Sequence, residues 1–517
     1  MGNAPGYPTG PQPRRDEVLV VRGVGEKRTP GQWAVLVGIP GALIVLGVVV
    51  VLALTHTKPQ VDVQSRTAPQ QAASQGQPTA PGAPAQPVNP TADTPFPATP
   101  APAAVAAPPP GASMPAASPG AAASVSGSAV WDQFRGPGRM NISPESLARS
   151  FPASGPKRLW QITLGEGHAG AAVYKGRVYI LDYNTGARRD ELKCLDLNTG
   201  QQLWSQGYAV DIKSNHGTSR TIPATDGKYV VSIGPMGQVM CCDANSGKLL
   251  WKRDLVKEYG TVIPTWYGGQ CPLIENGNAI IAPGGKALMI AVSLPTGKVT
   301  WSTPNPKGWQ MTHSSIMPVQ FAGKRIYVYP ATGGVVGVNA ANGQLLWSTS
   351  EWTVNTANVP TAVPLGSDGR LFVCGGYNSG AAILQMGAGG TSVSVVKRIK
   401  PNTFQSHQQT PILYQGHLYG VRIPAELVCL DLNGNVVWSS GSTARFGLGP
   451  YVMANGILYV LSDTGEMTIV AASASGYKPL AKAKVVPGPD AWAPIAIADG
   501  KLLCRDRTTM ICLDMRP

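Results

Sequence analysis

One pattern of apolar and polar residues recurs along most of the chain. An apolar strand is followed by a polar turn containing Asn, Thr or Ser with Gly, and then by a strand that ends in tryptophan. The first copy, LKCLDLNTGQQLW, ends at Trp204, and later copies end at Trp251, Trp301, Trp347 and Trp438. Glycine adopts the positive φ that a tight turn requires, and the alternating strands can turn one face toward a core. The pattern predicts β-hairpins.

The spacing of these hairpins predicts how they are assembled. Neighbouring copies lie 46 to 50 residues apart, and the 91 residues from Trp347 to Trp438 leave room for a degenerate copy near residues 392–399. Repeats of 40 to 50 residues with several short strands are typical of propeller blades. A second marker, a glycine before an apolar strand, occurs at Gly176, Gly227, Gly277, Gly323, Gly369, Gly416, Gly456 and Gly500. We therefore expect an all-β fold, an eight-bladed β-propeller over residues 157–517.

The two ends of the repeat region complement each other. The last repeat stops after three strands and lacks its tryptophan strand, whereas a strand ending in Trp160 precedes the first complete repeat. We expect this strand to complete the eighth blade and close the ring, which would hide two sheet edges. The structural tryptophans of the repeat are then Trp160, Trp204, Trp251, Trp301, Trp347 and Trp438.

The residues before the repeats predict a tethered protein. Residues 1–32 are polar and basic, residues 33–54 contain no charge, and residues 55–128 are rich in Pro, Ala and Gln. An uncharged stretch of this length, at ~1.5 Å per residue, can span a bilayer, and the preceding basic residues favour a cytoplasmic N-terminus. We expect a single-pass anchor in the inner membrane, a disordered linker, a lead-in segment at 129–156 and an exported propeller. A buried helix of a soluble protein is the alternative for residues 33–54.

Charge narrows the choice of partner. The net charge is +14, and residues 129–517 hold 35 of the 42 basic and 23 of the 28 acidic residues. A basic surface favours anionic lipid headgroups, an acidic cell-wall polymer or an acidic protein. Nucleic acid is not expected, because the predicted topology exports the propeller.

Candidate binding residues recur at one position of the repeat, 8 to 11 residues before a marker glycine. This position predicts that they surround one mouth of the central channel, where a planar or polar ligand could bind. The alternative is that they cap inner strands and form hydrogen bonds between blades. No metal site is predicted, because the four histidines belong to blades spread around the ring. The candidates are His168, His216, Arg220, Trp266, His313, Asn358, His407 and Trp492.

The sequence contains none of four common catalytic or cofactor-binding motifs. These are the G-x-S-x-G elbow, H-E-x-x-H, the P-loop and C-x-x-C-H. Asp196, Asp243 and Asp431 recur at the turns and are interpreted as turn formers. Cys194, Cys241, Cys429 and Cys512 share one repeat position and are interpreted as small buried strand residues, although Cys504 and Cys512 could form a cross-strand disulfide.

The repeat resembles a known family. The motif D-x-x-T/S-G-x-x-x-W, at Asp196 to Trp204 and Asp243 to Trp251, resembles the pyrroloquinoline-quinone (PQQ) repeat. This repeat builds eight-bladed propellers in quinoprotein dehydrogenases and in the outer-membrane assembly factor BamB. The lead-in sequence WDQFRGP is similar to that of exported bacterial PQQ-like proteins. The resemblance covers roughly residues 131–517 and is specific for the fold.

The resemblance implies two functions. The first is a BamB-like, non-enzymatic scaffold that binds an envelope protein or a cell-wall polymer. The alternative is a PQQ-dependent dehydrogenase that oxidises alcohols or sugars with PQQ and calcium. Under that alternative, Cys241 and Cys242 would form a vicinal disulfide like that of methanol-dehydrogenase-like enzymes. A sensor that signals to residues 1–32 is a third and weaker hypothesis, because that tail is short.

Overall fold

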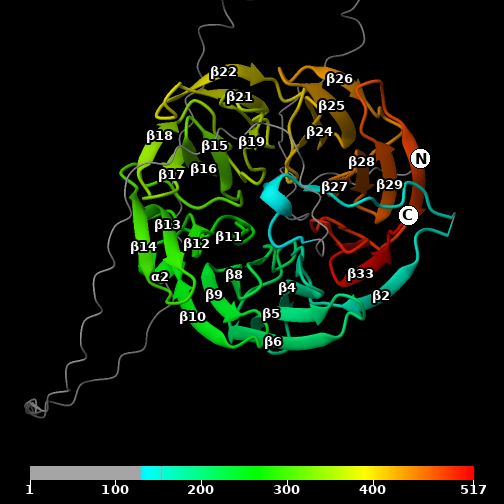
Figure 1. Cartoon of the computed structure of the whole chain (residues 1–517), viewed down its shortest axis with the longest axis horizontal. Helices are drawn as coiled ribbons and strands as arrows, with labels where there is room; N and C mark the ends of the chain where they lie inside the picture. The colour runs from blue at the N-terminus through cyan, green and yellow to red at the C-terminus, as the bar shows by residue number, and fades with distance from the viewer. Residues whose placement is uncertain (1–129, 153) are drawn as a thin grey trace, which may run out of the picture. The chain divides into compact units, whose positions relative to one another are not determined.

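The computed structural model describes residues 130–152 and 154–517, which form eight antiparallel sheets arranged in a ring (Figure 1). The predicted cytoplasmic tail, membrane anchor and linker lie outside the described residues. Within the described residues, no helix is long and apolar enough to cross a membrane. The prediction of an all-β, eight-bladed propeller is confirmed.

Each blade is a meander of four strands from the centre of the ring to its rim. Blades one to four contain β3 (Ala172–Tyr174), β4 (Arg177–Asn184), β5 (Arg189–Asp196), β6 (Gln202–Ala209); β7 (Ala224–Thr225), β8 (Tyr229–Ile233), β9 (Gln238–Asp243), β10 (Leu249–Asp254); β11 (Leu273–Glu275), β12 (Asn278–Ile281), β13 (Ala287–Ser293), β14 (Val299–Pro304); β15 (Met317–Phe321), β16 (Lys324–Ala331), β17 (Gly334–Asn339) and β18 (Leu345–Thr349).

The second half of the ring follows the same order. Blades five to eight contain β19 (Val363–Pro364), β20 (Arg370–Cys374), β21 (Ala381–Met386), β22 (Val393–Ile399); β23 (Ile412–Tyr414), β24 (His417–Arg422), β25 (Glu426–Asp431), β26 (Val436–Ser439); β27 (Tyr451–Ala454), β28 (Ile457–Leu461), β29 (Glu466–Ala471), β30 (Pro479–Lys484); and β31 (Ala496–Ala498), β32 (Lys501–Arg505), β33 (Thr509–Asp514) with β2 (Arg158–Thr163). The remaining elements are η1 (Pro137–Arg139), β1 (Ile142–Ser143) and α2 (Leu255–Tyr259).

The ring closes as the sequence predicts. Strand β2 pairs with β33 at the rim of blade eight, and Trp160 stands opposite Cys512. Figure 1 shows β2 beside β33, although the two strands come from opposite ends of the repeat region. The eighth blade is therefore built from both ends of the propeller sequence, and neither edge is left open there.

In four blades the repeated tryptophan donates a hydrogen bond to the next blade. The indole Nε1 of Trp160 donates to the Leu197 carbonyl in blade one, 2.9 Å away, and Trp251 donates to the Leu294 carbonyl at 2.6 Å. Trp204 and Trp438 make equivalent bonds to Ala244 and Ser473. The motif that marks the repeat in the sequence is thus a contact between blades.

This hydrogen bond is missing between blade four and blade five, where the hairpin of blade five is the degenerate copy. The Nε1 atom of Trp347 is buried and has no hydrogen-bond partner among the described residues. In blade five, Lys397 stands opposite Ile383 at the position that tryptophan holds in blade four opposite Gly337, and the outer strand β22 packs against β18 of blade four.

The lead-in segment crosses the centre of the ring, and Figure 1 shows it in cyan among the inner strands. Two buried arginines anchor it. Arg135 donates to the carbonyls of Thr410 and Pro411, and Arg139 donates to those of Pro272 and Ile316.

Further contacts connect the lead-in to other blades. Trp131 bridges to Val173 in blade one, and β1 extends blade seven by pairing in parallel with β27. The lead-in also accepts a bond from Thr225 in blade two, and Glu145 accepts one from Gly500 in blade eight. The segment thus bonds to seven blades, and it occupies the centre of the propeller.

Two smaller predictions need correction. The sequence from Ser143 to Glu145 could begin a short helix, but Ser143 ends strand β1, and its hydroxyl accepts a bond from the Glu145 amide. The cross-strand disulfide is also wrong. Cys512 lies opposite Leu503, not Cys504, and this one-residue offset turns the two thiols to opposite faces of the sheet.

Candidate functional site

The predicted site residues lie in the loops that connect the outer strand of one blade to the inner strand of the next. His216 precedes β7, Trp266 precedes β11 and His407 precedes β23. The turns between second and third strands reach the same face of the ring, because every strand reverses direction. One of these turns, between β20 and β21, adds Tyr377, which the sequence analysis did not identify.

Four aromatic rings from different blades meet at this face. The ring centroids of Trp266 and Tyr377 are 6.3 Å apart and nearly parallel, although the residues belong to blades three and five. Tyr377 stacks on His407 at 4.5 Å with an interplanar angle of 8°, and His216 meets Trp266 edge-on at 6.2 Å. His216 is exposed and the other three are partly exposed. We call His216, Trp266, Tyr377 and His407 the aromatic mouth.

Backbone geometry holds these rings in place. His216, Trp266 and Tyr377 have φ of 53°, 67° and 55°, a conformation that costs a non-glycine residue about 1 kcal/mol or more. The guanidinium of Arg220 donates from Nε to the Trp266 carbonyl and from Nη2 to the His216 carbonyl. Arg220 therefore fastens two of the strained loops together.

The Tyr377 turn is equally constrained. Tyr377 and Asn378 both have positive φ, as a type I′ hairpin turn requires, and the Asn378 amide donates to the side chain of Gln405. Gly376 has to be glycine, since a Cβ there would lie 2.0 Å from Cδ2 of His407. The stack of Tyr377 on His407 thus depends on a residue without a side chain.

His168 and Trp492 form a second pair beside the aromatic mouth. Their ring centroids are 5.0 Å apart, and the Trp492 indole donates to Asp463 at 2.7 Å. His168 is buried, and neither ring nitrogen has a partner among the described residues. Burial, reinforced by the positive charges of Arg220, Arg505 and Arg507, holds the pKa of His168 well below its usual value.

His313 and Asn358 are buried below the loop surface. Burial, with a contribution from Arg220, lowers the pKa of His313 to about 4, and burial lowers the pKa of His407 to about 4. These imidazoles are therefore neutral at pH 7. Arg220 keeps its positive charge but donates to backbone carbonyls, so its guanidinium serves to hold the loops of the mouth.

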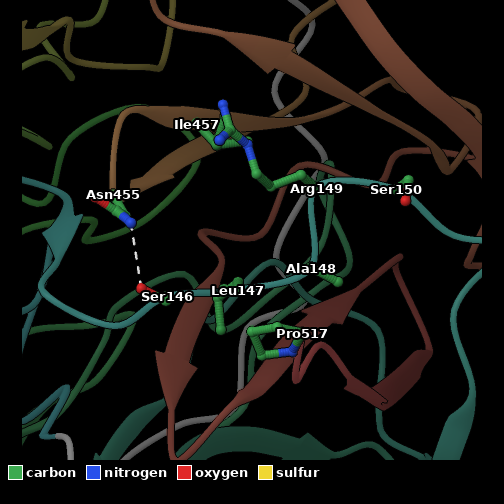
Figure 2. A pocket seen from close by; sticks show the side chains of 8 residues that line it. All are labelled: Ser146, Leu147, Ala148, Arg149, Ser150, Asn455, Ile457 and Pro517. Atoms are coloured by element: carbon green, nitrogen blue, oxygen red, sulfur yellow. Dashed lines mark hydrogen bonds between the residues drawn. The ribbon is translucent and has the colours of Figure 1, made fainter.

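A groove of about 390 Å³ lies elsewhere on the molecule (Figure 2). It is formed by the lead-in and blade seven, and Figure 2 shows Asn455 donating to Ser146 across it. It contains none of the predicted site residues. Its lining is Ser146, Leu147, Ala148, Arg149, Ser150, Asn455, Ile457 and Pro517.

Comparison with known proteins shows what the chain is similar to. A family model described as "Outer membrane protein assembly factor BamB" matches residues 188–433. The BamB of Moranella endobia (strain PCIT) is 25% identical over 287 residues, which cover 52% of this chain and 69% of that protein. The eight-bladed propeller is therefore PQQ-like in the sense that its repeats are similar to those of BamB proteins.

Quinoproteins are also similar to this PQQ-like propeller. Quinohemoprotein alcohol dehydrogenase ADH-IIG of Pseudomonas putida is 35% identical over 92 residues, but the match covers only 16% of this chain and 12% of that enzyme. A europium-containing methanol dehydrogenase superposes with a TM-score of 0.54 at 14% identity, covering 74% of this chain and 89% of that chain. At this identity the likeness concerns the fold alone.

The residues of this PQQ-like propeller do not fit the quinone cofactor that the dehydrogenase resemblance implies. Cys241 and Cys242 are free, fully buried and consecutive in the regular strand β9, so they point to opposite faces of the sheet. They pack in different clusters, Cys241 with Val231 and Cys242 with Val178. The expected vicinal disulfide is therefore not formed, and the ring centre is filled by Arg135 and Arg139.

The sequence analysis located part of this site. His216, Trp266 and His407 meet, as predicted, while His168 and Trp492 form a separate pair. Asp196 is a turn former as interpreted: its Oδ1 accepts from the amides of Asn198 and Thr199. Tyr377 was missed because it lies outside the repeat position searched. Its signal was the GGYNSG turn, where two glycines and an asparagine surround an aromatic residue.

Proposed function

We propose that this PQQ-like propeller is a membrane-tethered, exported scaffold that binds a protein partner in the cell envelope without catalysing a reaction. The observation that supports the proposal is the aromatic mouth. Four rings from four blades converge on one face and are held by strained loops, while the lead-in fills the ring below them. Such a rigid, partly exposed aromatic cluster is the kind of surface that anchors protein partners.

The anchor at residues 33–54 and the location of the propeller outside the cytoplasm belong to this proposal. Both rest on the sequence pattern, and the similarity to BamB proteins supports an envelope location. Protease added to intact spheroplasts should degrade the propeller and leave residues 1–32 protected; the reverse pattern would refute the topology.

Site-specific photo-crosslinking tests the scaffold function. The full chain, expressed in its own membrane, carries a photoreactive amino acid at Tyr377. The control carries it at Val437 on the outer strand β26, where the side chain is 43% exposed. We expect a discrete adduct at position 377 that weakens when Trp266→Ala is added. Adducts that are the same at both positions, or absent at 377, would contradict the proposal.

PQQ-dependent oxidation of alcohols or sugars is the second candidate, and the 35% identity to a quinohemoprotein over a short stretch favours it. It requires PQQ and calcium to bind. Titration of the full chain with both, followed by absorbance and by dye reduction with an alcohol or sugar, would support this candidate if binding is saturable. The binding scaffold requires neither.

A further inference from the structure

We propose that the propeller contacts an anionic lipid surface through an apolar ridge at the edge of blade two. The ridge consists of Val256, in helix α2, and of Val262 and Ile263, in the loop that follows this helix. This inference goes beyond the scaffold function, because it concerns a different surface and a lipid. It does not depend on the protein partner of the aromatic mouth.

The ridge exposes a continuous set of apolar side chains. Val262 is 58% exposed, the highest value among the large apolar side chains of the described residues, and Val256 is 40% exposed. Val256 and Ile263 lie against the same turn, since a Cβ on Gly237 would be 3.8 Å from Val256 Cγ2 and 3.1 Å from Ile263 Cδ1. These residues therefore form one patch, unlike apolar residues that are scattered singly over a surface.

The backbone of the ridge is held by hydrogen bonds. The Thr261 hydroxyl donates to the Leu255 carbonyl at 2.9 Å, and the Val262 amide donates to the side chain of Gln310 at 3.2 Å. Helix α2 packs against β9 and β10, and Figure 1 shows it at the edge of the ring beside β10. Since the ridge is already ordered, contact with a surface has little conformational entropy to remove.

Lysines flank the ridge on both sides. The Lys286 amide donates to the Tyr259 carbonyl of α2 at 2.8 Å, and the Lys213 carbonyl accepts a bond at 2.6 Å from the hydroxyl of Tyr267, which follows the ridge. Both lysines are exposed, and the Lys286 ammonium donates only to a backbone carbonyl. Neither lysine forms an ion pair with an acidic residue in the part of the chain that the structure describes.

The acidic groups beside the ridge are neutralised within the protein. The Glu258 carboxylate pairs with Arg253, and the Asp254 carboxylate lies 3.5 Å from the Lys257 ammonium. The surplus charge around the ridge is therefore positive. It is complementary to anionic headgroups, which attract exposed lysines near the membrane surface.

The composition of the ridge favours lipid over protein. Apolar side chains with flanking lysines match an interfacial contact, in which the apolar groups enter the boundary between headgroups and acyl chains. Protein interfaces are instead depleted in lysine and enriched in aromatic residues and arginine. The ridge lies on the face of the ring that carries the aromatic mouth, so the contact would bring this face to the bilayer.

Fluorescence quenching by lipid tests the proposal on the full chain reconstituted into vesicles. Val262→Cys carries an environment-sensitive fluorophore, and the matched control is Val437→Cys in blade six, opposite blade two in the ring, where the side chain is 43% exposed. The native cysteines are buried, and the parent protein measures any background labelling. The vesicles contain phosphatidylcholine and a spin-labelled phosphatidylcholine as quencher, with or without phosphatidylglycerol. We expect strong quenching at position 262 only with phosphatidylglycerol, and little at position 437 in either vesicle.

Charge variants assign the contact to the ridge. Lys213→Gln with Lys286→Gln should lower the ratio of lipid-bound to free ridge about fivefold per lysine. The control, Lys175→Gln with Lys228→Gln, removes the same charge from turns on the opposite face and should leave the ratio unchanged.

Four results would overturn the inference. They are no quenching at position 262, equal quenching at positions 262 and 437, equal effects of the two double variants, and shielding of position 262 from an aqueous quencher in native membranes without quenching by lipid. The last result would show that a protein covers the ridge. None of them affects the crosslink at position 377, so failure of this inference would leave the scaffold function intact.

Discussion

At the scale of the residue, the repeated tryptophan is hydrogen-bonded to the next blade in some blades and not in others. Trp251 donates to the Leu294 carbonyl of the next blade, whereas Trp347 has a buried indole N–H without a partner among the described residues. Trp347 is also more deeply buried than Trp251, which is half-buried. Comparing the two therefore sets the hydrogen bond of Trp251 against the deeper packing of Trp347.

We predict that Trp251→Phe destabilises the fold by about 1 kcal/mol more than Trp347→Phe, because only the first leaves a carbonyl unpaired. The free energy of unfolding in urea measures both. Equal losses would show that ring packing alone determines the cost.

A second prediction at this scale concerns acid stability. Burial lowers the pKa of His313 to about 4, while an unfolded histidine titrates near 6.5. The unfolded chain therefore binds more protons as the pH falls, so stability due to His313 is complete above about pH 6.5 and is lost toward pH 4, by at most about 3 kcal/mol.

Unfolding free energies at about pH 7.5 and about pH 4.5 check this prediction. His313→Asn should lose less stability on acidification than the parent protein. His216→Asn, at an exposed position, should follow the parent. An identical acid response in all three proteins would contradict the assignment to His313.

At the scale of the element, the lead-in behaves as a part of the propeller core. It is tied to seven blades, and its turn at Gly136 passes directly over Trp131. A Cβ at Gly136 would lie 2.5 Å from the Trp131 ring, whereas one at Gly138 would meet nothing closer than 3.7 Å. Both glycines have a φ of 61°, but ψ is −149° at Gly136 and 8° at Gly138. Gly136 therefore lies in a region that is nearly exclusive to glycine, whereas Gly138 lies near the left-handed helical region, so the two differ in backbone strain as well as in packing.

We predict that Gly138→Ala costs about 1 kcal/mol, the strain of an alanine at positive φ. Gly136→Ala should cost about 3 kcal/mol or more, because overpacking against Trp131 is added and its backbone conformation is less accessible to alanine. Thermal unfolding of the two variants gives the comparison. Limited proteolysis should release the lead-in faster from Gly136→Ala; similar midpoints and cleavage rates would mean that the lead-in is not part of the core.

At the scale of the whole molecule, the pairing of β2 with β33 holds the ring closed. Thr163 stands opposite Thr509 across this joint, and Gln385 stands opposite Ser394 within blade five. A disulfide at the first pair would close a loop that contains almost the whole propeller sequence. A disulfide at the second pair would close a loop of a single hairpin.

We predict that Thr163→Cys with Thr509→Cys, once oxidised, stabilises the protein by about 6 kcal/mol, and that Gln385→Cys with Ser394→Cys does so by about 3 kcal/mol, since the longer loop loses more entropy when unfolded. Unfolding midpoints with and without reductant measure both. A larger gain from the hairpin disulfide would contradict closure through β2.

The fold was predictable because its determinants are local and repeated. Turn glycines, polar turn residues such as Asp196 and terminal tryptophans recur in most of the blades, and a strand missing at one end is present at the other. The residues of the aromatic mouth were only partly predictable. His216, Trp266 and His407 share a position in the repeat, but Tyr377 reaches them from a different turn, and no spacing in the sequence relates the two.

The sequence by itself determined the number of blades, the closure of the ring and the position of the degenerate copy, because hydrophobic periodicity and turn chemistry act within a single repeat. Only the tertiary structure decided that the lead-in fills the centre, that Cys241 and Cys242 face apart, and that aromatic rings from four blades meet. Those features depend on strand register and on contacts between residues more than a hundred positions apart, which a linear pattern does not specify.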